Sequence, residues 1–217
     1  MNIEQARFNM VEQQIRPWNV LDLSVLELLS VVKREAFVPA AFKGLAFADM
    51  EIPLGFGQCM LAPRMEARLL QDLAIQAHET VLEIGAGAGY MAALMAHKAH
   101  RVLSLEMVPE LATMARNNLR LAGIQNAEVR AGDGADQAAA EETYDVIVLS
   151  GSVAEVPQHL LALLKVGGRL AAVVGDEPVM RATFVTRTSA SDYRTIQPWD
   201  CDAPRLQNFG ELSKFKF

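Results

Sequence analysis

The sequence has few cysteines, few aromatic residues and no recognisable metal-binding pattern. Its 217 residues include two cysteines, Cys59 and Cys201, and 6% aromatic residues. Two isolated cysteines are more typical of free thiols in a reducing compartment than of a disulfide. The four histidines do not fall into the spacing of a zinc site, so we expect no metal.

A membrane-spanning run and an excess of positive charge are also missing. The longest stretch without a charged residue, Ile84 to His97, is shorter than the ~20 apolar residues that cross a bilayer, and charges interrupt the N-terminus. We therefore expect a cytoplasmic protein with no membrane partner. Lys and Arg number 20 against 26 Asp and Glu, and this net charge of −6 disfavours nucleic acid as a partner. No pattern predicts a particular oligomeric state.

The length and the apolar content of 51% are sufficient for one globular domain with a full core, and we expect residues 1–217 to form it. Residues 1–77 make its first zone. Apolar spacing there predicts a helix around Val25–Val32 and a second over Pro63–Gln76. Between these helices, Ile52–Pro63 has no helical period and is rich in glycine and proline, which indicates a loop.

Residues 78–217 make the second zone, in which short apolar runs alternate with helical segments. The expected strands are 81–84, 101–105, 127–130, 146–149 and 169–174, and the expected helices are about 90–99, 110–122, 134–140 and 156–164. Two more strands, 182–188 and 211–217, could pair as an antiparallel C-terminal hairpin. The pattern predicts an α/β fold: a Rossmann-like, doubly wound, mostly parallel seven-stranded sheet with an N-terminal helical cap.

The most specific feature is a glycine loop between an expected strand and an expected helix. Gly85, Gly87 and Gly89 occupy it, and glycines at a helix N-terminus let a nucleotide-like ligand approach the backbone. In the dinucleotide fingerprint the third glycine comes one residue later. Glu83 precedes the loop and would repel a pyrophosphate, which argues against a nicotinamide-linked oxidoreductase. The same carboxylate could hold the ammonium group of a sulfonium cofactor with a methionine tail.

Two more carboxylates follow expected strands at matching intervals. Glu106, before Met107, lies roughly 20 residues after the glycine loop, where an acidic side chain accepts hydrogen bonds from ribose hydroxyls. Asp133, before Gly134, suits the exocyclic amine of adenine, although Gly-Asp-Gly is also an ordinary turn. Together with Glu83 and the glycine loop, these residues predict a site for S-adenosyl-L-methionine.

These residues resemble the class I S-adenosylmethionine-dependent methyltransferases, and the flanking sequence resembles the protein-L-isoaspartate O-methyltransferase family. The resemblance covers most of the chain up to Gly175. Its segments are Met10–Gln14, Phe37–Pro39, Leu45–Asp49, Ile52–Gly55, Gly57–Gln58, Val81–Tyr90, Gly132–Gly134, Tyr144–Val148 and Leu164–Leu170. Many methyltransferases share the glycine loop, whereas the Ile-Pro-Leu-Gly-x-Gly-Gln segment is specific to this family.

The resemblance implies transfer of a methyl group to the free α-carboxylate of an isoaspartyl residue in a damaged protein or peptide. Such a carboxylate is ionised at neutral pH and needs no general base. Orientation and desolvation of the reactants would then supply most of the catalysis. The resemblance also implies that Gln58 and Cys59, in the loop before Pro63, contact the substrate.

One departure from the family pattern falls in this substrate loop. Where the family reads Gly-Gln-Thr-Ile-Ser-x-Pro, this chain reads Gly-Gln-Cys-Met-Leu-Ala-Pro over residues 57–63. Leu61 stands at the serine position and donates no side-chain hydrogen bond. Cys59, at the threonine position, is a substrate contact, a reactive thiol or, as we favour, a buried small residue. Two alternatives therefore stay open: a methyltransferase for another acceptor, such as an unidentified small molecule, and a non-catalytic protein that binds an adenosyl ligand.

Overall fold

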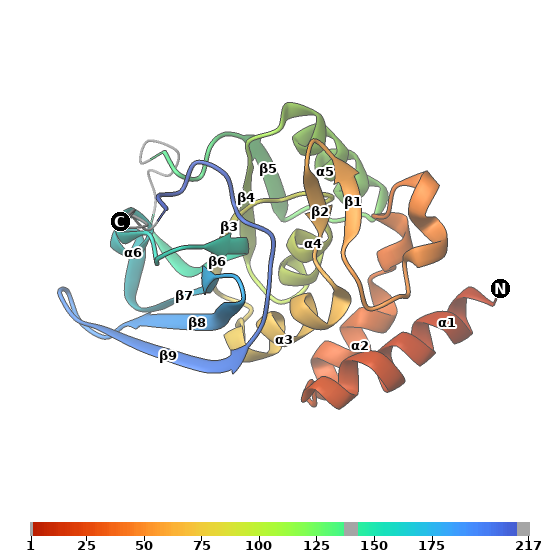
Figure 1. Cartoon of the computed structure of the whole chain (residues 1–217), viewed down its shortest axis with the longest axis horizontal. Helices are drawn as coiled ribbons and strands as arrows, with labels where there is room; N and C mark the ends of the chain where they lie inside the picture. Colours follow the sequence, from red (N-terminus) through yellow and green to blue (C-terminus); the bar gives the residue numbers. More distant parts are fainter. Residues whose placement is uncertain (1, 137–142, 212–217) are drawn as a thin grey trace.

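The computed structural model describes residues 2–136 and 143–211, and a twisted sheet forms its centre (Figure 1). Seven strands lie in the order β5-β4-β3-β6-β7-β8-β9. The first five in this order are parallel, and β8 runs antiparallel to both β7 and β9. The strands are β3 Thr80–Ile84, β4 Arg101–Glu106, β5 Ala127–Ala131, β6 Tyr144–Val153, β7 Leu164–Asp176, β8 Val179–Arg187 and β9 Tyr193–Asp200. The predicted mostly parallel sheet with an antiparallel C-terminal hairpin is confirmed.

Helices cover both faces of this sheet. Successive residues of its strands point to opposite faces, and the side chains on both faces are apolar. Val81 and Val102 pack with the cluster that contains residues of α3, α4 and α5, and Leu82 and Leu103 pack with the cluster that contains residues of α6. The helices are α3 Pro63–Leu73, α4 Tyr90–Ala96, α5 Pro109–Leu121 and α6 Gln158–Ala162. Both faces are therefore buried, as a parallel sheet requires.

The N-terminal residues form the predicted helical cap, which lies beside α3 and at one end of the molecule (Figure 1). Asn2 and Asp22 cap its two α-helices with side-chain oxygens that accept backbone N–H groups. The elements are α1 Ile3–Asn9, the π-helix η1 Met10–Ile15, the 3₁₀ turn η2 Arg16–Trp18, α2 Leu23–Val31, and the 3₁₀ turns η3 Arg34–Ala36 and η4 Ala40–Leu45.

The stretch predicted as a loop, Ile52–Pro63, is instead a short antiparallel hairpin. Strand β1 covers Ile52–Gly55 and pairs with β2, Gln58–Met60. Its turn places Gly55, Phe56 and Gly57 at positive φ, a conformation that the two glycines adopt without strain. Side chains of β1 alternate between buried and exposed. Four residues are too few for this period of two to stand out from the sequence.

The C-terminal hairpin is also built differently from the prediction. Its second strand is β9, Tyr193–Asp200, rather than residues 211–217. Nearly every side chain of β9 is exposed, so this edge strand lacks the apolar alternation that would reveal it. Glu211 lies outside any strand, and residues 212–217 lie outside the described residues. Most of the helix predicted at 134–140 falls there too, while Leu164, predicted to end a helix, begins β7.

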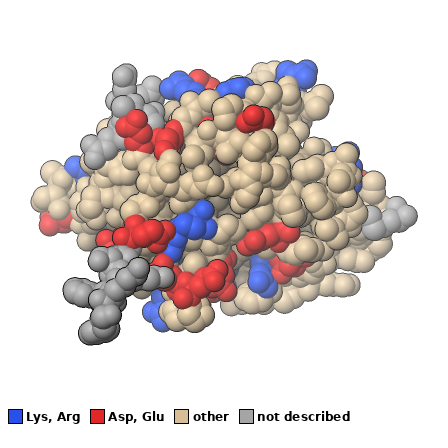
Figure 2. Space-filling model, turned by 45° about the horizontal axis from the view of Figure 1, so that its top comes forward, with Lys and Arg blue, Asp and Glu red and all other residues tan. Residues whose placement is uncertain are grey.

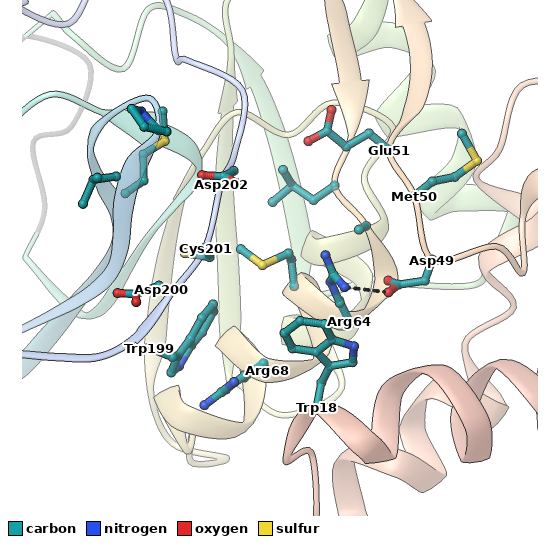
Figure 3. Close-up of a pocket in the computed structure, with 16 residues that line it drawn as sticks. Trp18, Asp49, Met50, Glu51, Arg64, Arg68, Trp199, Asp200, Cys201 and Asp202 are labelled. Atoms are coloured by element: carbon teal, nitrogen blue, oxygen red, sulfur yellow. Dashed lines mark ion pairs between the residues drawn. The ribbon is translucent and has the colours of Figure 1, made fainter.

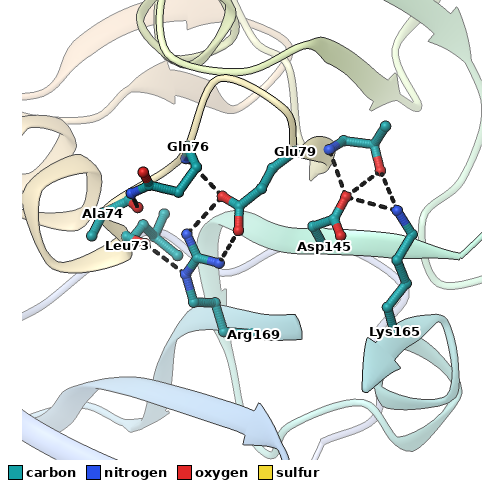
Figure 4. A network of polar contacts seen from close by, with 8 residues as sticks. Leu73, Ala74, Gln76, Glu79, Asp145, Lys165 and Arg169 are labelled. Carbon is teal, nitrogen blue, oxygen red and sulfur yellow. Dashed lines mark hydrogen bonds and ion pairs between the residues drawn. The ribbon is translucent and has the colours of Figure 1, made fainter. Parts of the chain in front are cut away.

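A network of hydrogen bonds and ion pairs links the end of α3 to the amino ends of the central strands (Figure 4). The Arg169 guanidinium donates to both carboxylate oxygens of Glu79, at 2.7 and 2.9 Å, and to the Leu73 carbonyl at 2.6 Å. Beside it, Asp145 accepts hydrogen bonds from Thr80 and from the Lys165 ammonium. This network anchors α3 to the sheet.

Charged side chains of both signs are interspersed on the face of the molecule seen in Figure 2. This mixture agrees with the balance of 20 basic and 26 acidic residues in the sequence. Within residues 2–136 and 143–211, no helix combines the length and apolarity needed to pass through a bilayer.

Candidate active site

The carboxylate of Glu83 lies fully buried at the carboxyl end of β3. Parallel strands place hydroxyl groups of β4 and β6 on the same face of the sheet. Ser104 and Ser150 donate to its two oxygens at 2.5 and 2.7 Å. Burial raises the pKa of Glu83 to about 7, while the two serine hydroxyls act in the opposite direction. The site therefore holds a carboxyl group that a cationic ligand would ionise at neutral pH.

The glycine loop between β3 and α4 contacts the end of β4 through a second carboxylate. Glu106 accepts from the backbone N–H of Gly87 at 2.8 Å and from that of Val108 at 3.0 Å. Its side chain is held in place, and carboxylate oxygens retain lone pairs for further donors such as hydroxyls. Gly89 has a φ of +85°, and a Cβ atom at this position would lie only 3.3 Å from Ala115 of α5. Gly89 therefore allows close packing of two helices and does not line the site.

Two small cavities lie along the ends of β3, β4 and β5 and meet at Gly85. The glycine-loop cavity is lined by Cys59, Leu61, Glu66, Glu83, Gly85, Gly87, Tyr90 and Ser150, among others. The strand-tip cavity is lined by Gln58, Gly85, Glu106, Met107, Asp133, Gly134, Leu206, Gln207 and Phe209, among others. All predicted cofactor residues except Gly89 therefore border one of these two cavities, which we together call the crevice.

The segment after β9 forms part of the crevice wall, because Leu206, Gln207 and Phe209 line the strand-tip cavity. Backbone hydrogen bonds of 2.7 and 2.9 Å join Ser152 of β6 to Pro204 and Leu206. The Leu206 side chain packs over Gly85, so that a Cβ atom at residue 85 would lie only 3.1 Å from Leu206 Cδ2. Asn208 donates to Asp133 at 2.5 Å. The crevice is thus narrowed by the protein's own C-terminal segment.

The substrate loop brings a half-buried thiol to the glycine-loop cavity. Cys59 Sγ donates to Glu51 Oε2 at 3.6 Å. Burial and the nearby Glu51 carboxylate raise the pKa of Cys59 to about 12, so the thiol stays protonated at neutral pH. This position agrees with a partly buried small residue and not with an activated thiolate. Leu61 is buried, and Gln58 reaches the strand-tip cavity.

A buried charge cluster joins the N-terminal cap to both the loop and the glycine turn. Arg34 is fully buried, pairs with Glu66 of α3 and donates to the Leu61 carbonyl at 2.7 Å. Its guanidinium also lies 5.0 Å from the ring centroid of Tyr90. Burial raises the pKa of Glu66, and Arg34 opposes this shift. The Tyr90 hydroxyl is buried without a hydrogen-bond partner and belongs to the glycine-loop cavity.

A much larger pocket, of about 480 Å³, opens on the other side of Leu61. We name it the two-tryptophan pocket because Trp18 and Trp199 both line it, together with Leu61, Arg64, Arg68 and Met180 among others (Figure 3). Leu61 borders this pocket and the glycine-loop cavity alike. A molecule in the pocket would therefore lie one side chain away from the crevice.

Several residues of the site were not predicted from the sequence. Glu66 falls on the apolar face of α3, three and four positions before Leu69 and Leu70. A charged residue on an apolar helix face could have indicated a buried functional group. Ser104 similarly interrupts an apolar strand. Leu206 had no such signal, because its place depends on backbone pairing with Ser152 of β6, far away in the sequence.

Comparison with known proteins identifies the family. The family model described as protein-L-isoaspartate(D-aspartate) O-methyltransferase matches residues 5–197. The chain belongs to this family. It is 42% identical to protein-L-isoaspartate O-methyltransferase of Methanoculleus marisnigri over 79% of this chain and 78% of that one. It is 40% identical to protein-L-isoaspartate O-methyltransferase 1 of Rhodopseudomonas palustris over 88% of this chain and 78% of that one.

A solved structure confirms the fold. The crystal structure of a Plasmodium falciparum protein described as a putative protein-L-isoaspartate O-methyltransferase, in complex with S-adenosyl-L-homocysteine, aligns with a TM-score of 0.79. It is 19% identical and covers 95% of this chain and 99% of that one. The predicted family, its methyltransferase class and its dependence on S-adenosylmethionine are thereby confirmed.

The residues of the crevice also fit this cofactor by their own chemistry. Glu66, Glu83, Glu106 and Asp133 bring carboxylates to its walls, and within the described residues no Lys or Arg lines either cavity. Carboxylates accept hydrogen bonds from ammonium and hydroxyl groups but repel a diphosphate. The unpartnered Tyr90 hydroxyl offers one more polar contact to a ligand.

Proposed function

We propose that this chain methylates the free α-carboxylate of isoaspartyl residues in damaged proteins or peptides. The observation that carries the proposal is the meeting of the substrate loop with the carboxylate-lined crevice at the ends of the parallel strands. The family membership, with relatives named for this substrate, supports it. We propose further that residues 1–217 act as one unit, with 1–77 on the acceptor side and 78–217 on the cofactor side.

In this proposal each wall of the crevice recognises one part of the cofactor, which supplies the sulfonium methyl group. Glu83 accepts from the ammonium group, Glu106 from the ribose hydroxyls and Asp133 from the adenine amine. Gly85 and Gly87 let the ligand approach the backbone, and Met107 and Gly134 border the adenosine. Leu206 must turn aside for binding, because its side chain packs over Gly85.

On the acceptor side, the chain orients a group that is already nucleophilic. An α-carboxylate is ionised at neutral pH, so no residue of the loop has to remove a proton. The Cys59 thiol, protonated at neutral pH, is a weak donor to the acceptor, whereas Gln58, predicted to contact the substrate, lines the strand-tip cavity on the cofactor side. Leu61 and Met60 exclude water from the point of transfer, which strengthens these contacts.

A second candidate function is methyl transfer to a different acceptor, and one observation favours it. The Glu51 carboxylate lies 3.6 Å from the thiol of Cys59, which stands at the threonine position of the family pattern, and it would repel an acceptor carboxylate there. A carboxylate there suits an acceptor that is neutral or cationic. The apolar Leu61 at the usual serine position points in the same direction.

Two measurements on the full chain test these proposals. We expect calorimetry to show binding of S-adenosylhomocysteine and not of NADH, and we expect methanol release from an isoaspartyl peptide but not from the matched aspartyl peptide. Binding without release, combined with labelled-methyl transfer into an extract without isoaspartyl sites, would replace the first function by the second. Binding with no transfer to any acceptor would identify a non-catalytic adenosyl-binding protein.

We propose a cytoplasmic location for this activity. Cys59 and Cys201 are free and half-buried, and the structure pairs neither with another cysteine. Free thiols persist in a reducing compartment. Fractionation of cells that produce the chain, followed by detection in the soluble cytoplasmic fraction, would test the location independently of the activity.

A further inference from the structure

The two-tryptophan pocket has a charge distribution that selects its occupant. At the bottom of the view in Figure 3, Trp18 lies beside Arg64 and Arg68, and at the top lie Glu51 and Asp202. Glu51 and Asp202 therefore lie away from both arginines, whereas the other two acidic side chains of the pocket, Asp49 and Asp200, lie beside Arg64 and Trp199. The acidic side is the one next to the substrate loop, because Glu51 contacts Cys59.

On the aromatic side of the pocket, both guanidinium groups rest on indole rings. Arg64 lies 4.1 Å from the Trp18 ring centroid and pairs with Asp49 at 3.2 Å. Arg68 lies 4.5 Å from the Trp199 ring centroid. Such stacking fixes both arginines against the wall, so neither has to reach into the pocket to find a partner.

On the acidic side, two carboxylates lack a cation. Asp200 pairs with Arg181 at 3.0 Å, but no ion pair joins Glu51 or Asp202 to any Lys or Arg of the described residues. The contact that the structure gives Glu51 is the neutral Cys59 thiol. The two exposed carboxylates therefore leave a negative potential at the edge of the pocket that faces the loop.

The floor between these two sides is apolar and adaptable. Leu61, Ala62, Met65 and Met180 belong to one buried cluster that lines the pocket. Methionine side chains adjust to the shape of an occupant. An aliphatic stem with a positive end matches this combination, since lysine and arginine lay their methylene groups on apolar surface and keep the charge at a polar edge.

We propose that the two-tryptophan pocket binds a lysine or arginine side chain of the substrate, next to the isoaspartyl residue in sequence. This inference rests on the proposed isoaspartyl methyltransferase function. A bound basic side chain would also offset the repulsion between the Glu51 carboxylate and the acceptor carboxylate, because its positive charge lies beside both. The pocket thereby makes basic neighbours a specificity determinant of this chain.

The test uses isoaspartyl peptides that differ only at the residue before or after the isoaspartyl site, which is lysine, arginine, norleucine, alanine or glutamate. We expect KM for the lysine and arginine peptides to be roughly three- to tenfold lower than for the norleucine peptide at one of the two positions, with little change in kcat, because exposed charge pairs contribute modestly. The glutamate peptide should have the highest KM.

Variants then assign the preference to the pocket. The double variant Glu51→Gln/Asp202→Asn should remove the difference between the lysine and norleucine peptides, while Glu110→Gln, on the exposed surface of α5, should preserve it. Equal KM values at both positions, or a preference that survives the double variant, would overturn the proposal while methanol release still supports the enzyme function. Release from none of the peptides, alanine included, would overturn the function and with it this inference.

Discussion

The cofactor side and the acceptor side of this active site differ in how they are built. The cofactor side consists of strand ends and a glycine turn, and its carboxylates are fixed by hydrogen bonds from neighbouring elements. The acceptor side consists of a four-residue and a three-residue strand beside an open pocket. The departures from the family pattern, Cys59 and Leu61, lie on the acceptor side. The crevice thus keeps the glycine loop and the carboxylates of the family pattern, while the adjoining hairpin departs from that pattern.

The largest expected effect comes from breaking the link between the two sides. Arg34→Met leaves the Glu66 carboxylate buried without its partner and removes the hydrogen bond to the Leu61 carbonyl. We expect the free energy of unfolding to fall by about 3–5 kcal/mol, measured by urea denaturation. Adding Glu66→Leu should restore most of it, since the uncompensated charge is then gone. A double variant as unstable as Arg34→Met would contradict this account.

The next effect separates the two sides. Glu106→Ala removes the acceptor of two backbone N–H groups and, as proposed, of the ribose hydroxyls. Calorimetry should show S-adenosylhomocysteine binding weaker by about 1–3 kcal/mol. The KM for the isoaspartyl peptide should stay within twofold. Glu110→Ala on the exposed face of α5 is the matched control and should change neither value.

Glu83 should make cofactor affinity depend on pH. Burial raises the pKa of the Glu83 carboxyl to about 7. The nearby carboxylates of Glu66 and Glu106 act in the same direction, and the hydroxyls of Ser104 and Ser150 act against it. A ligand ammonium favours the ionised form, so affinity for S-adenosylhomocysteine should rise as pH increases through 7, by at most about tenfold per pH unit. Binding should release a proton, which calorimetry in buffers of different ionisation enthalpy detects.

The same shift affects the ligand-free protein in the opposite sense. A carboxyl whose folded pKa is raised stabilises the fold while it is protonated, and this stabilisation is lost as pH rises from the unfolded value near 4.5 to about 7. Glu83→Gln should remove the pH dependence of affinity and weaken that of the free energy of unfolding, to which Glu66, with its pKa also raised by burial to about 7, contributes as well. An affinity of wild-type protein that is constant across this range would show that Glu83 does not contact the ammonium group.

The smallest effect tests whether the altered loop limits turnover. Leu61→Ser restores the hydroxyl of the family pattern, and one added hydrogen bond is worth about 0.5–1.5 kcal/mol. We expect isoaspartyl turnover to rise roughly two- to tenfold with the S-adenosylhomocysteine Kd unchanged. Leu61→Ala creates a similar cavity without the hydroxyl. If alanine raises turnover as much as serine does, the hydrogen bond is not the cause.

The sequence predicted most of the sheet because its central strands are continuous apolar runs followed by helical patterns. Glu83, Glu106 and the glycine turn were predictable for a related reason: parallel strands end at one edge, so residues after successive strands must meet there. Strand β9 was missed because its side chains are mostly exposed, and β1 because four residues show no clear period.

The unpredicted part of the site depends on contacts between distant segments. Arg34 and Glu66 are 32 residues apart and meet only because the N-terminal cap packs on α3. Leu206 reaches Gly85 through pairing between Ser152 and the segment after β9. The two-tryptophan pocket likewise combines Trp18 of the cap with Trp199 of the last strand. No local pattern encodes such meetings.

The most direct test of this account is a crystal structure of the chain grown with S-adenosylhomocysteine. The account predicts the ligand along the ends of β3, β4 and β5, with its amino group at Glu83, its ribose at Glu106 and the Leu206 side chain moved off Gly85. Crystals grown at saturating ligand in which Leu206 still covers Gly85 and the crevice holds no adenosyl group would contradict it.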